Sequence, residues 1–241
     1  GTFNVNPFGF PALYLKLALF FLAAVWLFME HVDNRAPDYQ LTRVKYALLL
    51  IILPVAVLAA GVQLRYFLGL RADVITSCCG SLFSDNSKTV AADLAQMAPL
   101  PAMIVFYAVL AAVLLAGVHY LWRRRGALIF SGLCAVAFPV AIGAVIAFLS
   151  LYVYDHPHHH CPFCLLKAEY GYVGYLIYLP LFSASALGAA LGITLPFARA
   201  ASLQPVMAQV TPRVVTTATA LFALFVALVA WFSWRSHLFL L

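Results

Sequence analysis

Six long apolar segments set the architecture that this chain can adopt. Each is long enough to cross a bilayer, for which a helix needs about 20 predominantly apolar residues. A membrane β-barrel is disfavoured, because its strands alternate polar and apolar residues and these segments are continuously apolar. We therefore predict an all-α, polytopic membrane helical bundle of about six transmembrane helices, in a single integral membrane domain over 1–241. The predicted spans are 10–29, 46–70, 100–122, 127–153, 171–196 and 214–234.

The composition agrees with a bilayer environment. The chain is 65% hydrophobic and 9% charged, whereas a soluble domain carries about 25% charged residues. The formal net charge of +6 does not indicate nucleic acid, because the basic residues lie in loops beside apolar segments, where they anchor and orient a membrane protein. We expect the lipid bilayer as a partner and no nucleic acid.

The loops alternate in charge, and this alternation predicts the orientation of the chain. Arginine and lysine gather in the loops 31–45, 123–126 and 197–213, while the loops 71–99 and 154–170 carry few basic residues and several acidic ones. The positive-inside rule puts the three basic loops in the cytoplasm. Both termini and both cysteine-containing loops are then extracytoplasmic, and a bacterial inner membrane is the predicted location.

The first extracytoplasmic loop contains a predicted short helix over 84–97. Val90, Leu94 and Met97 recur at i, i+4 and i+7, which is one apolar stripe of a helix. Such a helix lies flat on the membrane or packs on the bundle as an ordinary loop helix. The sequence leaves both arrangements open.

Four of the five cysteines lie on the predicted outer face, in two pairs. Cys78 and Cys79 are adjacent, Cys161 and Cys164 form a C-x-x-C, and Cys134 lies inside the fourth apolar segment as a small buried residue. A disulfide between neighbouring cysteines is strained and easily reduced. Adjacent thiols also bind soft ions such as Cu(I) or Hg(II). A third arrangement pairs one of them with the C-x-x-C across the outer surface.

The motif Cys161-Pro162-Phe163-Cys164 opens the fifth apolar segment. Pro162 suits the first turn of a helix, where its missing N–H is not needed, so Cys161 is predicted near the N-cap. The positive end of a helix dipole stabilises a thiolate there, and Lys167 adds a positive charge one turn later. We predict a lowered thiol pKa and redox activity; a structural disulfide is the alternative.

Four histidines immediately precede this motif. Together with the two thiols they offer a transition-metal site, for copper or another soft metal. A covalent haem site is excluded, because it needs C-x-x-C-H and here the histidines come first. The alternative is a polar, pH-sensitive loop at the membrane surface. The candidate metal ligands are His156, His158, His159 and His160, with Cys161 and Cys164.

Four residues are candidates for contact with a flat aromatic cofactor such as a quinone. Arg65, near the end of the second segment, either reaches the membrane interface or meets a quinone carbonyl. Lys167 follows the C-x-x-C motif directly. Tyr170 and Tyr172 belong to a stretch dense in aromatic residues, which fits an interfacial aromatic belt or a quinone site.

The segment C-P-F-C-L-L-K at 161–167 resembles the redox centre of the vitamin K epoxide reductase family and of bacterial quinone-coupled disulfide-generating membrane proteins. In both groups a C-x-x-C lies at the membrane edge of a helix beside a quinone, and an outer-loop cysteine pair passes electrons to it. The resemblance implies that Cys161 and Cys164 are the quinone-proximal pair. It makes Cys78 and Cys79 the shuttle pair, although shuttle cysteines in those families are separated. Neither group has six core helices or a run of four histidines before the motif.

Three functions follow from these patterns. The first is a membrane thiol–disulfide oxidoreductase that relays electrons between an extracytoplasmic thiol protein and a membrane quinone. The second is a soft-metal binding, delivery or transport protein, which exchanges copper or a mercury-like ion with a metal-carrier protein. The third is a structural subunit that assembles with other membrane subunits and uses its cysteines in plain disulfides.

Overall fold

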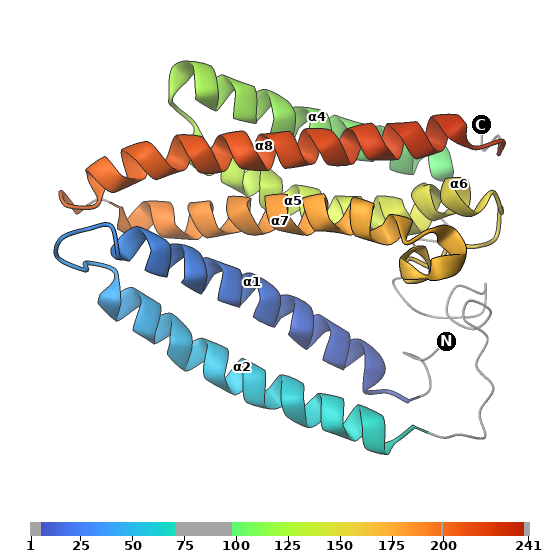
Figure 1. Ribbon diagram of the computed structural model, residues 1–241, viewed down its shortest axis with the longest axis horizontal. Coiled ribbons are helices and arrows are strands. Elements are labelled where there is room, and N and C mark those ends of the chain that lie inside the picture. The colour runs from blue at the N-terminus through green and yellow to red at the C-terminus, as the bar shows by residue number, and fades with distance from the viewer. Residues whose placement is uncertain (1–5, 71–97, 199, 239–241) are drawn as a thin grey trace.

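The structure is a bundle of antiparallel helices (Figure 1). It is a computed structural model that describes residues 6–70, 98–198 and 200–238. Within these residues, six helical segments are long and apolar enough to cross a membrane, so the chain is an integral membrane protein of the predicted all-α class. The segments are α1 (Gly9–Asp33), α2 (Thr42–Leu68), α4 (Pro99–Arg123), the continuous run α5, η2 and α6 (Ala127–Ala144, Val145–Leu149, Ser150–Tyr154), α7 (Val173–Thr194) with η5 (Leu195–Phe197), and α8 (Gln204–Arg235).

The first five predicted spans agree with these helices to within a few residues, but the start of the sixth is wrong. Helix α8 begins at Gln204 and not at residue 214. Its first turns are interrupted by polar residues such as Gln204 and Arg213, which lower the local hydropathy. They are nonetheless helical, because Met207 and Val210 are buried against the bundle.

The α5–α6 run contains one turn of π-helix, η2, whose five residues are all buried. A π-turn is uncommon inside an α-helix and often marks a functional site. Pro139 lies inside α5, as Pro54 lies inside α2 and Pro180 inside α7. Proline is tolerated in spanning helices, because neighbouring groups satisfy the freed backbone carbonyls.

Helices α5 and α7 approach closely where small residues face each other. A Cβ added to Gly192 would lie 2.8 Å from the Cβ of Ser131, and one added to Gly188 would overlap Cys134. Gly188 and Gly192 form the small-x-x-x-small spacing that lets membrane helices pack tightly. Cys134 is fully buried there, which confirms its predicted role as a small core residue.

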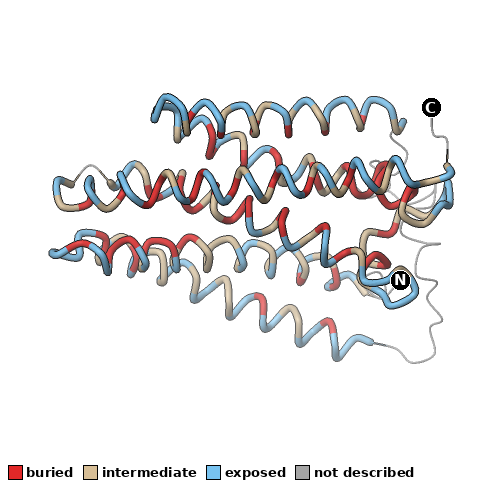
Figure 2. Tube along the Cα trace, turned by 45° about the horizontal axis from the view of Figure 1, so that its top comes forward, coloured by how far each residue is buried: buried red, intermediate tan, exposed pale blue. Residues whose placement is uncertain are grey.

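Helices α1 and α2 form a hairpin on one side of the other helices. T-shaped ring contacts attach α1 to the bundle, with centroids 5.5 Å apart for Phe20 and Phe182 and 4.9 Å apart for Phe21 and Phe138. Helix α2 packs mainly on α1, so that α1 lies between α2 and α7 (Figure 1). Few of its residues are buried (Figure 2), so most of its apolar surface is left for lipid.

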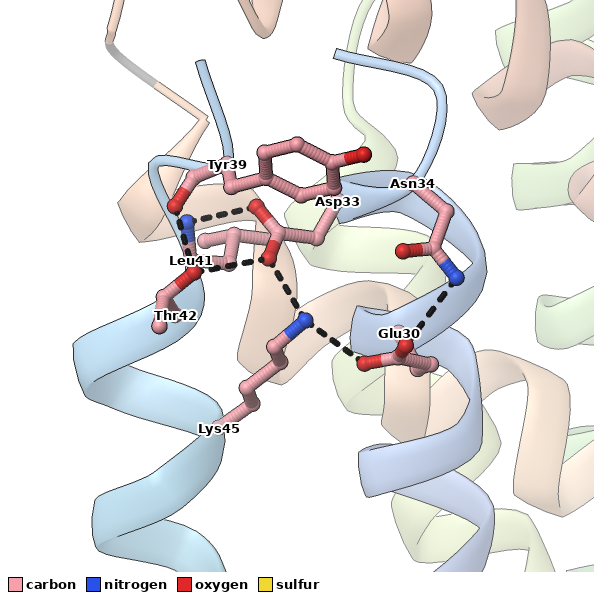
Figure 3. A network of polar contacts seen from close by, with 7 residues as sticks. All are labelled: Glu30, Asp33, Asn34, Tyr39, Leu41, Thr42 and Lys45. Carbon is pink, nitrogen blue, oxygen red and sulfur yellow. Dashed lines mark hydrogen bonds and ion pairs between the residues drawn. The ribbon is translucent and has the colours of Figure 1, made fainter. Parts of the chain in front are cut away.

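A charge network closes the α1–α2 hairpin (Figure 3). Lys45 Nζ lies 2.6 Å from Glu30 Oε2 and 2.8 Å from Asp33 Oδ2. The backbone N–H of Leu41 donates to Asp33 Oδ1 at 2.8 Å. Asp33 is fully buried and Lys45 nearly so. Lys45 was predicted to be a basic loop residue; it belongs instead to α2, because two carboxylates on the last turns of α1 neutralise it.

The alternating direction of the helices separates two ends of the bundle. The α1–α2, α4–α5 and α7–α8 connections, which carry arginines, lie at one end. The α6–α7 connection, the start of α1 and the end of α8 lie at the other (Figure 1). The helix predicted over 84–97 lies outside the described residues.

Candidate functional site

The connection between α6 and α7 folds back against the bundle. It leaves α6 at Asp155 and reaches α7 through Gly171, both with positive φ (48° and 62°). Between them, His160 Nδ1 lies 2.9 Å from the carbonyl oxygen of Ile146. Ile146 lies eight residues before Tyr154, the last residue of α6, which is about 12 Å along the axis at 1.5 Å per residue. The connection therefore re-enters the helix layer and does not lie on top of it.

The contact of His160 with a carbonyl oxygen defines which of its ring nitrogens carries a hydrogen. A carbonyl oxygen only accepts hydrogen bonds, so Nδ1 must be the donor, and Nε2 of the neutral ring then keeps its lone pair. The acceptor, Ile146, belongs to the π-helical turn η2, and the hydroxyl of Ser150 also approaches this oxygen, at 3.4 Å. The π-turn and the loop histidine are thus parts of one arrangement.

Two tyrosines from two spanning helices hold the C-P-F-C turn. The Tyr154 hydroxyl donates to the carbonyl oxygen of Cys161 at 2.6 Å, and the Tyr178 hydroxyl donates to that of Pro162 at 2.7 Å. A carbonyl away from water needs a partner. These two bonds, from α6 and α7, satisfy consecutive carbonyls and so define the path of the backbone through the motif.

Both sulfur-bearing residues of the motif are buried. Cys161 and Cys164 are each 2% exposed, and Cys161 is a thiol. A thiol of a large partner protein cannot reach sulfur atoms at this depth without a local opening. Exchange with a second pair of this chain, or with a small lipid-soluble molecule, needs much less space.

The prediction that this motif starts the fifth spanning helix is wrong. Cys164 begins a short 3-10 helix, η3 (Cys164–Leu166), and α7 starts only at Val173. The chain is interrupted between them by Lys167, which is extended, and by Gly171 in the left-handed region. Cys161 therefore does not cap α7.

The 3-10 helix lies tightly against the first turn of α7. A Cβ added to Gly174 would lie 2.8 Å from Leu166 Cδ2 and 2.9 Å from the backbone carbon of Leu165. Only a residue without a side chain permits this approach. The absence of a side chain at Gly174 thus allows η3, which begins at Cys164, to pack directly on α7, the helix of Tyr178.

An aromatic stack covers the motif on the histidine side. The rings of Tyr154 and His159 have centroids 4.0 Å apart and an interplanar angle of 30°, and Tyr170 lies 4.4 Å from Tyr154. Burial lowers the pKa of His159, because the charged imidazolium loses hydration, and repulsion from neighbouring basic groups adds to the effect. These groups are His156, His160 and Lys167.

The described residues do not assemble the predicted metal site. No three His, Cys, Asp or Glu side chains among them are grouped so as to hold an ion. His156 and His158 are exposed, with ring centroids 6.1 Å apart, and the backbone N–H of His158 donates to Nδ1 of His156 at 3.3 Å. Cys78 and Cys79, the other proposed ligands, lie outside the described residues.

Three of the four predicted cofactor-contact residues lie in one turn, where the backbone N–H groups of Tyr170 and Tyr172 donate to the carbonyl oxygen of Lys167, whereas Arg65 lies on α2. Lys167 is exposed and 3.9 Å from Glu169, and Tyr172 is 55% exposed. Arg65 is exposed in the last turn of α2, a helix that packs mainly on α1. Tyr170 is the one of the four that joins the aromatic stack.

The roles of Tyr154 and Tyr178 were missed from the sequence. Neither tyrosine was among the predicted site residues. The missed signal is position: each tyrosine lies at the end of a spanning helix that flanks the motif, and a buried tyrosine hydroxyl usually finds an acceptor. The nearest unsatisfied carbonyls are those of the turn between the two helices.

The site can be summarised as a buried cysteine turn, an aromatic stack and a histidine of defined tautomer at one end of a membrane bundle. Comparison of the chain with family models, with curated proteins and with solved structures finds no match. Chemical interpretation of the site therefore depends on its own geometry.

Proposed function

We propose that the protein is a membrane thiol–disulfide oxidoreductase, which relays electrons between an extracytoplasmic dithiol and a membrane quinone. One observation carries the proposal: Cys161 and Cys164, with two residues between them, are each 2% exposed and lie in a turn that is hydrogen-bonded to two spanning helices. This burial suits a pair that serves a small lipid-soluble acceptor. It leaves the contact with a protein partner to a second pair, Cys78 and Cys79.

The proposed reaction is a sequence of two-electron steps. A thiolate of the partner attacks the Cys78–Cys79 disulfide, and the partner's second thiolate resolves the mixed disulfide, so that the partner is oxidised and this pair is reduced. The reduced pair then reduces a Cys161–Cys164 disulfide by the same exchange. Finally the Cys161 and Cys164 thiols lose two electrons and two protons to the quinone, which leaves as quinol while their disulfide re-forms.

The described residues take distinct parts in this proposal. Tyr154 and Tyr178 position the cysteine turn through its carbonyls. The rings of Tyr154, His159 and Tyr170 are tilted against one another, and this aromatic cluster offers ring contacts to a quinone. When bound, the quinone supplies the electron acceptor and takes up the protons that the two thiols release.

The test measures quinone reduction by the purified full-length protein. With a reduced dithiol and a short-chain ubiquinone as substrates, Cys161→Ser and Cys164→Ser should each abolish turnover. Cys134→Ser is the matched control, because Cys134 is equally buried but lies in the α5–α7 contact, and it should retain activity. Quinone reduction at the wild-type rate in either motif variant rules out the proposal.

The same preparations separate this function from metal handling. We expect the reduced, anaerobic protein to contain no stoichiometric metal. Bound copper that is lost on replacement of His156 and His158, together with unchanged quinone reduction, would instead favour the soft-metal function.

We further propose a bacterial inner membrane with the cysteine end outside. The proposal is supported by the gathering of arginines at the opposite end of the bundle, as the positive-inside rule requires. Labelling of a cysteine placed at Ser236, which follows α8 at the cysteine end, should succeed with a membrane-impermeant reagent on intact spheroplasts. Labelling only after lysis means that the orientation is reversed.

A further inference from the structure

The arginine end of the bundle contains a hollow that the proposed redox function does not use. It has a volume of about 470 Å³ and lies between the α1–α2 connection and the first turns of α8. These two parts of the chain lie side by side in Figure 1. The lining combines basic, polar and apolar residues: Arg35, Arg213, Ser202, Gln209, Pro37, Pro205, Val206 and Val210.

The two arginines of the hollow are not neutralised by carboxylates. All ion pairs within the described residues use lysine and none uses arginine. Two of the carboxylates closest to Arg35 in the sequence are engaged elsewhere, because Glu30 and Asp33 bind Lys45. The third, Asp38, accepts a hydrogen bond from Gln40 at 2.7 Å and also interacts with Ser202 of the lining. Helix α8 contains no acidic residue. Two guanidinium groups against the one carboxylate of Asp38 leave the hollow with a net positive charge.

The start of α8 adds to this positive charge. The helix has 32 residues and begins at Gln204 without a side-chain cap. The positive end of its dipole lies at this first turn and favours anions there. The N–H of Gln204 already donates to the carbonyl oxygen of Ala200, and Pro205 has no N–H, so the dipole acts here through its charge alone. Pro205 and Val206 of this first turn line the hollow, so the dipole and both guanidinium groups act on the same space.

We infer that this hollow binds a phosphate-bearing anion. The planar guanidinium groups of Arg35 and Arg213 match phosphate oxygens in charge and geometry, and the Gln209 amide offers a further donor. At about 30 Å³ per water molecule, the volume exceeds the need of a bare ion and admits a phosphate ester. Two sources supply this chemistry, the headgroup of an anionic phospholipid and a free phosphate compound. The inference does not rest on the thiol chemistry.

The experiment uses the full-length protein in detergent and two probes. Native mass spectrometry follows titration with phosphatidylglycerol, with phosphatidylcholine as the neutral reference, and calorimetry follows inorganic phosphate. We expect Arg35→Gln and Arg213→Gln each to weaken binding about fivefold and the double variant about 25-fold, from the usual effect of one arginine on anionic lipid. Arg43→Gln is the matched control, because Arg43 is exposed at the same end but does not line the hollow.

The outcomes distinguish the source and can overturn the inference. Weaker phosphatidylglycerol binding alone identifies a lipid headgroup, and weaker binding of inorganic phosphate identifies a free compound. The inference is overturned if neither probe loses affinity in the double variant, or if Arg43→Gln weakens binding as much. Gln209→Glu puts a negative charge into the hollow on a side chain of the same size. If the double variant does not fold, this variant is the test: it should weaken anion binding, and unchanged affinity overturns the inference.

Discussion

The two ends of the bundle hold their connections by different kinds of interaction. At the arginine end, Lys45 bridges Glu30 and Asp33 and locks α1 to α2. At the cysteine end, neutral tyrosine hydroxyls bind backbone carbonyls, and rings stack on one another. Ion pairs therefore hold the connection at the arginine end, whereas neutral hydrogen bonds and ring contacts hold the connection at the cysteine end.

The two kinds of interaction hold the two ends of the bundle with different strength. A buried ion pair is costly to break, because removing one partner leaves an uncompensated charge, so the α1–α2 turn is a fixed structural joint. Hydroxyl–carbonyl bonds contribute about 1 kcal/mol each, so the C-P-F-C turn can shift when its sulfur atoms change their bonding. The predictions below test this contrast between the two ends.

The largest effect is expected at the arginine end. Lys45→Met leaves the fully buried Asp33 without its cation and should lower the free energy of unfolding by about 3 kcal/mol, measured in mixed detergent micelles. The triple variant Lys45→Met, Glu30→Gln and Asp33→Asn should recover part of the loss, because no charge stays buried. Arg43→Met, an exposed control in the same helix, should change little. Equal losses for Lys45→Met and Arg43→Met contradict this role of the network.

The next effect concerns the contact between η3 and α7. Gly174→Ala introduces a Cβ within 3.0 Å of Leu165 and Leu166 and should cost about 2 kcal/mol by overpacking. The displaced turn should also expose its cysteines to alkylation in the native protein. Gly61→Ala is the control, because no atom lies within 4 Å of the added Cβ. Identical alkylation rates in the two variants count against the tight packing of the turn.

Loss of a single tyrosine hydroxyl should have a moderate effect at the cysteine end. Tyr154→Phe and Tyr178→Phe each leave one carbonyl of the turn without its donor, at a cost of about 1–2 kcal/mol. If the cysteines react through local opening, alkylation of Cys161 and Cys164 should rise about tenfold for each 1.4 kcal/mol. Tyr175→Phe, on the exposed face of α7, should leave the rate unchanged. If the alkylation rate also rises in Tyr175→Phe, the hydroxyls of Tyr154 and Tyr178 have no specific role in holding the turn.

A smaller effect distinguishes the two nitrogens of His160. The amide of asparagine can replace the Nδ1 donor, whereas that of glutamine lies closer to Nε2. We expect His160→Asn to keep wild-type alkylation of the cysteines and His160→Gln to raise it, by the loss of a bond worth about 1 kcal/mol. The reverse order of the two variants would mean that the bond to Ile146 does not anchor the loop.

The smallest effect is a pH dependence at His159. Burial lowers its pKa below the model-compound value of 6.5, so the unfolded chain binds this proton more readily than the folded protein. The contribution of His159 to stability is therefore complete above pH 6.5 and is lost as the pH falls through the lowered pKa. The thermal midpoint of unfolding of the wild-type protein should fall between pH 7.5 and pH 5.5. His159→Phe keeps a ring beside Tyr154 but cannot bind a proton, so its midpoint should fall less. His158→Phe, at an exposed position, should keep the wild-type dependence; equal slopes in both variants contradict the assignment.

Helix positions were predicted well and helix ends poorly. The spans follow from apolar length, which the bilayer thickness imposes on each segment separately. The start of α8 was missed because its first turns are polar on one side, and burial of Met207 decides that they are helical. The C-P-F-C motif was predicted to start a helix from Pro162 alone, and the packing of the turn against Gly174 overrides that local preference.

Sequence alone was enough to predict a helical membrane protein, with six spans in the part of the chain that the structure describes, C-P-F-C at one end and arginines at the other. These properties are local, since they depend on the length, apolarity and charge of consecutive residues. The tertiary structure alone decided that the cysteines are buried, that Lys45 is paired and that Arg35 meets Arg213 at one hollow. Each of these contacts joins residues from different helices or loops, and the order of residues along one segment does not specify which partners packing brings to it.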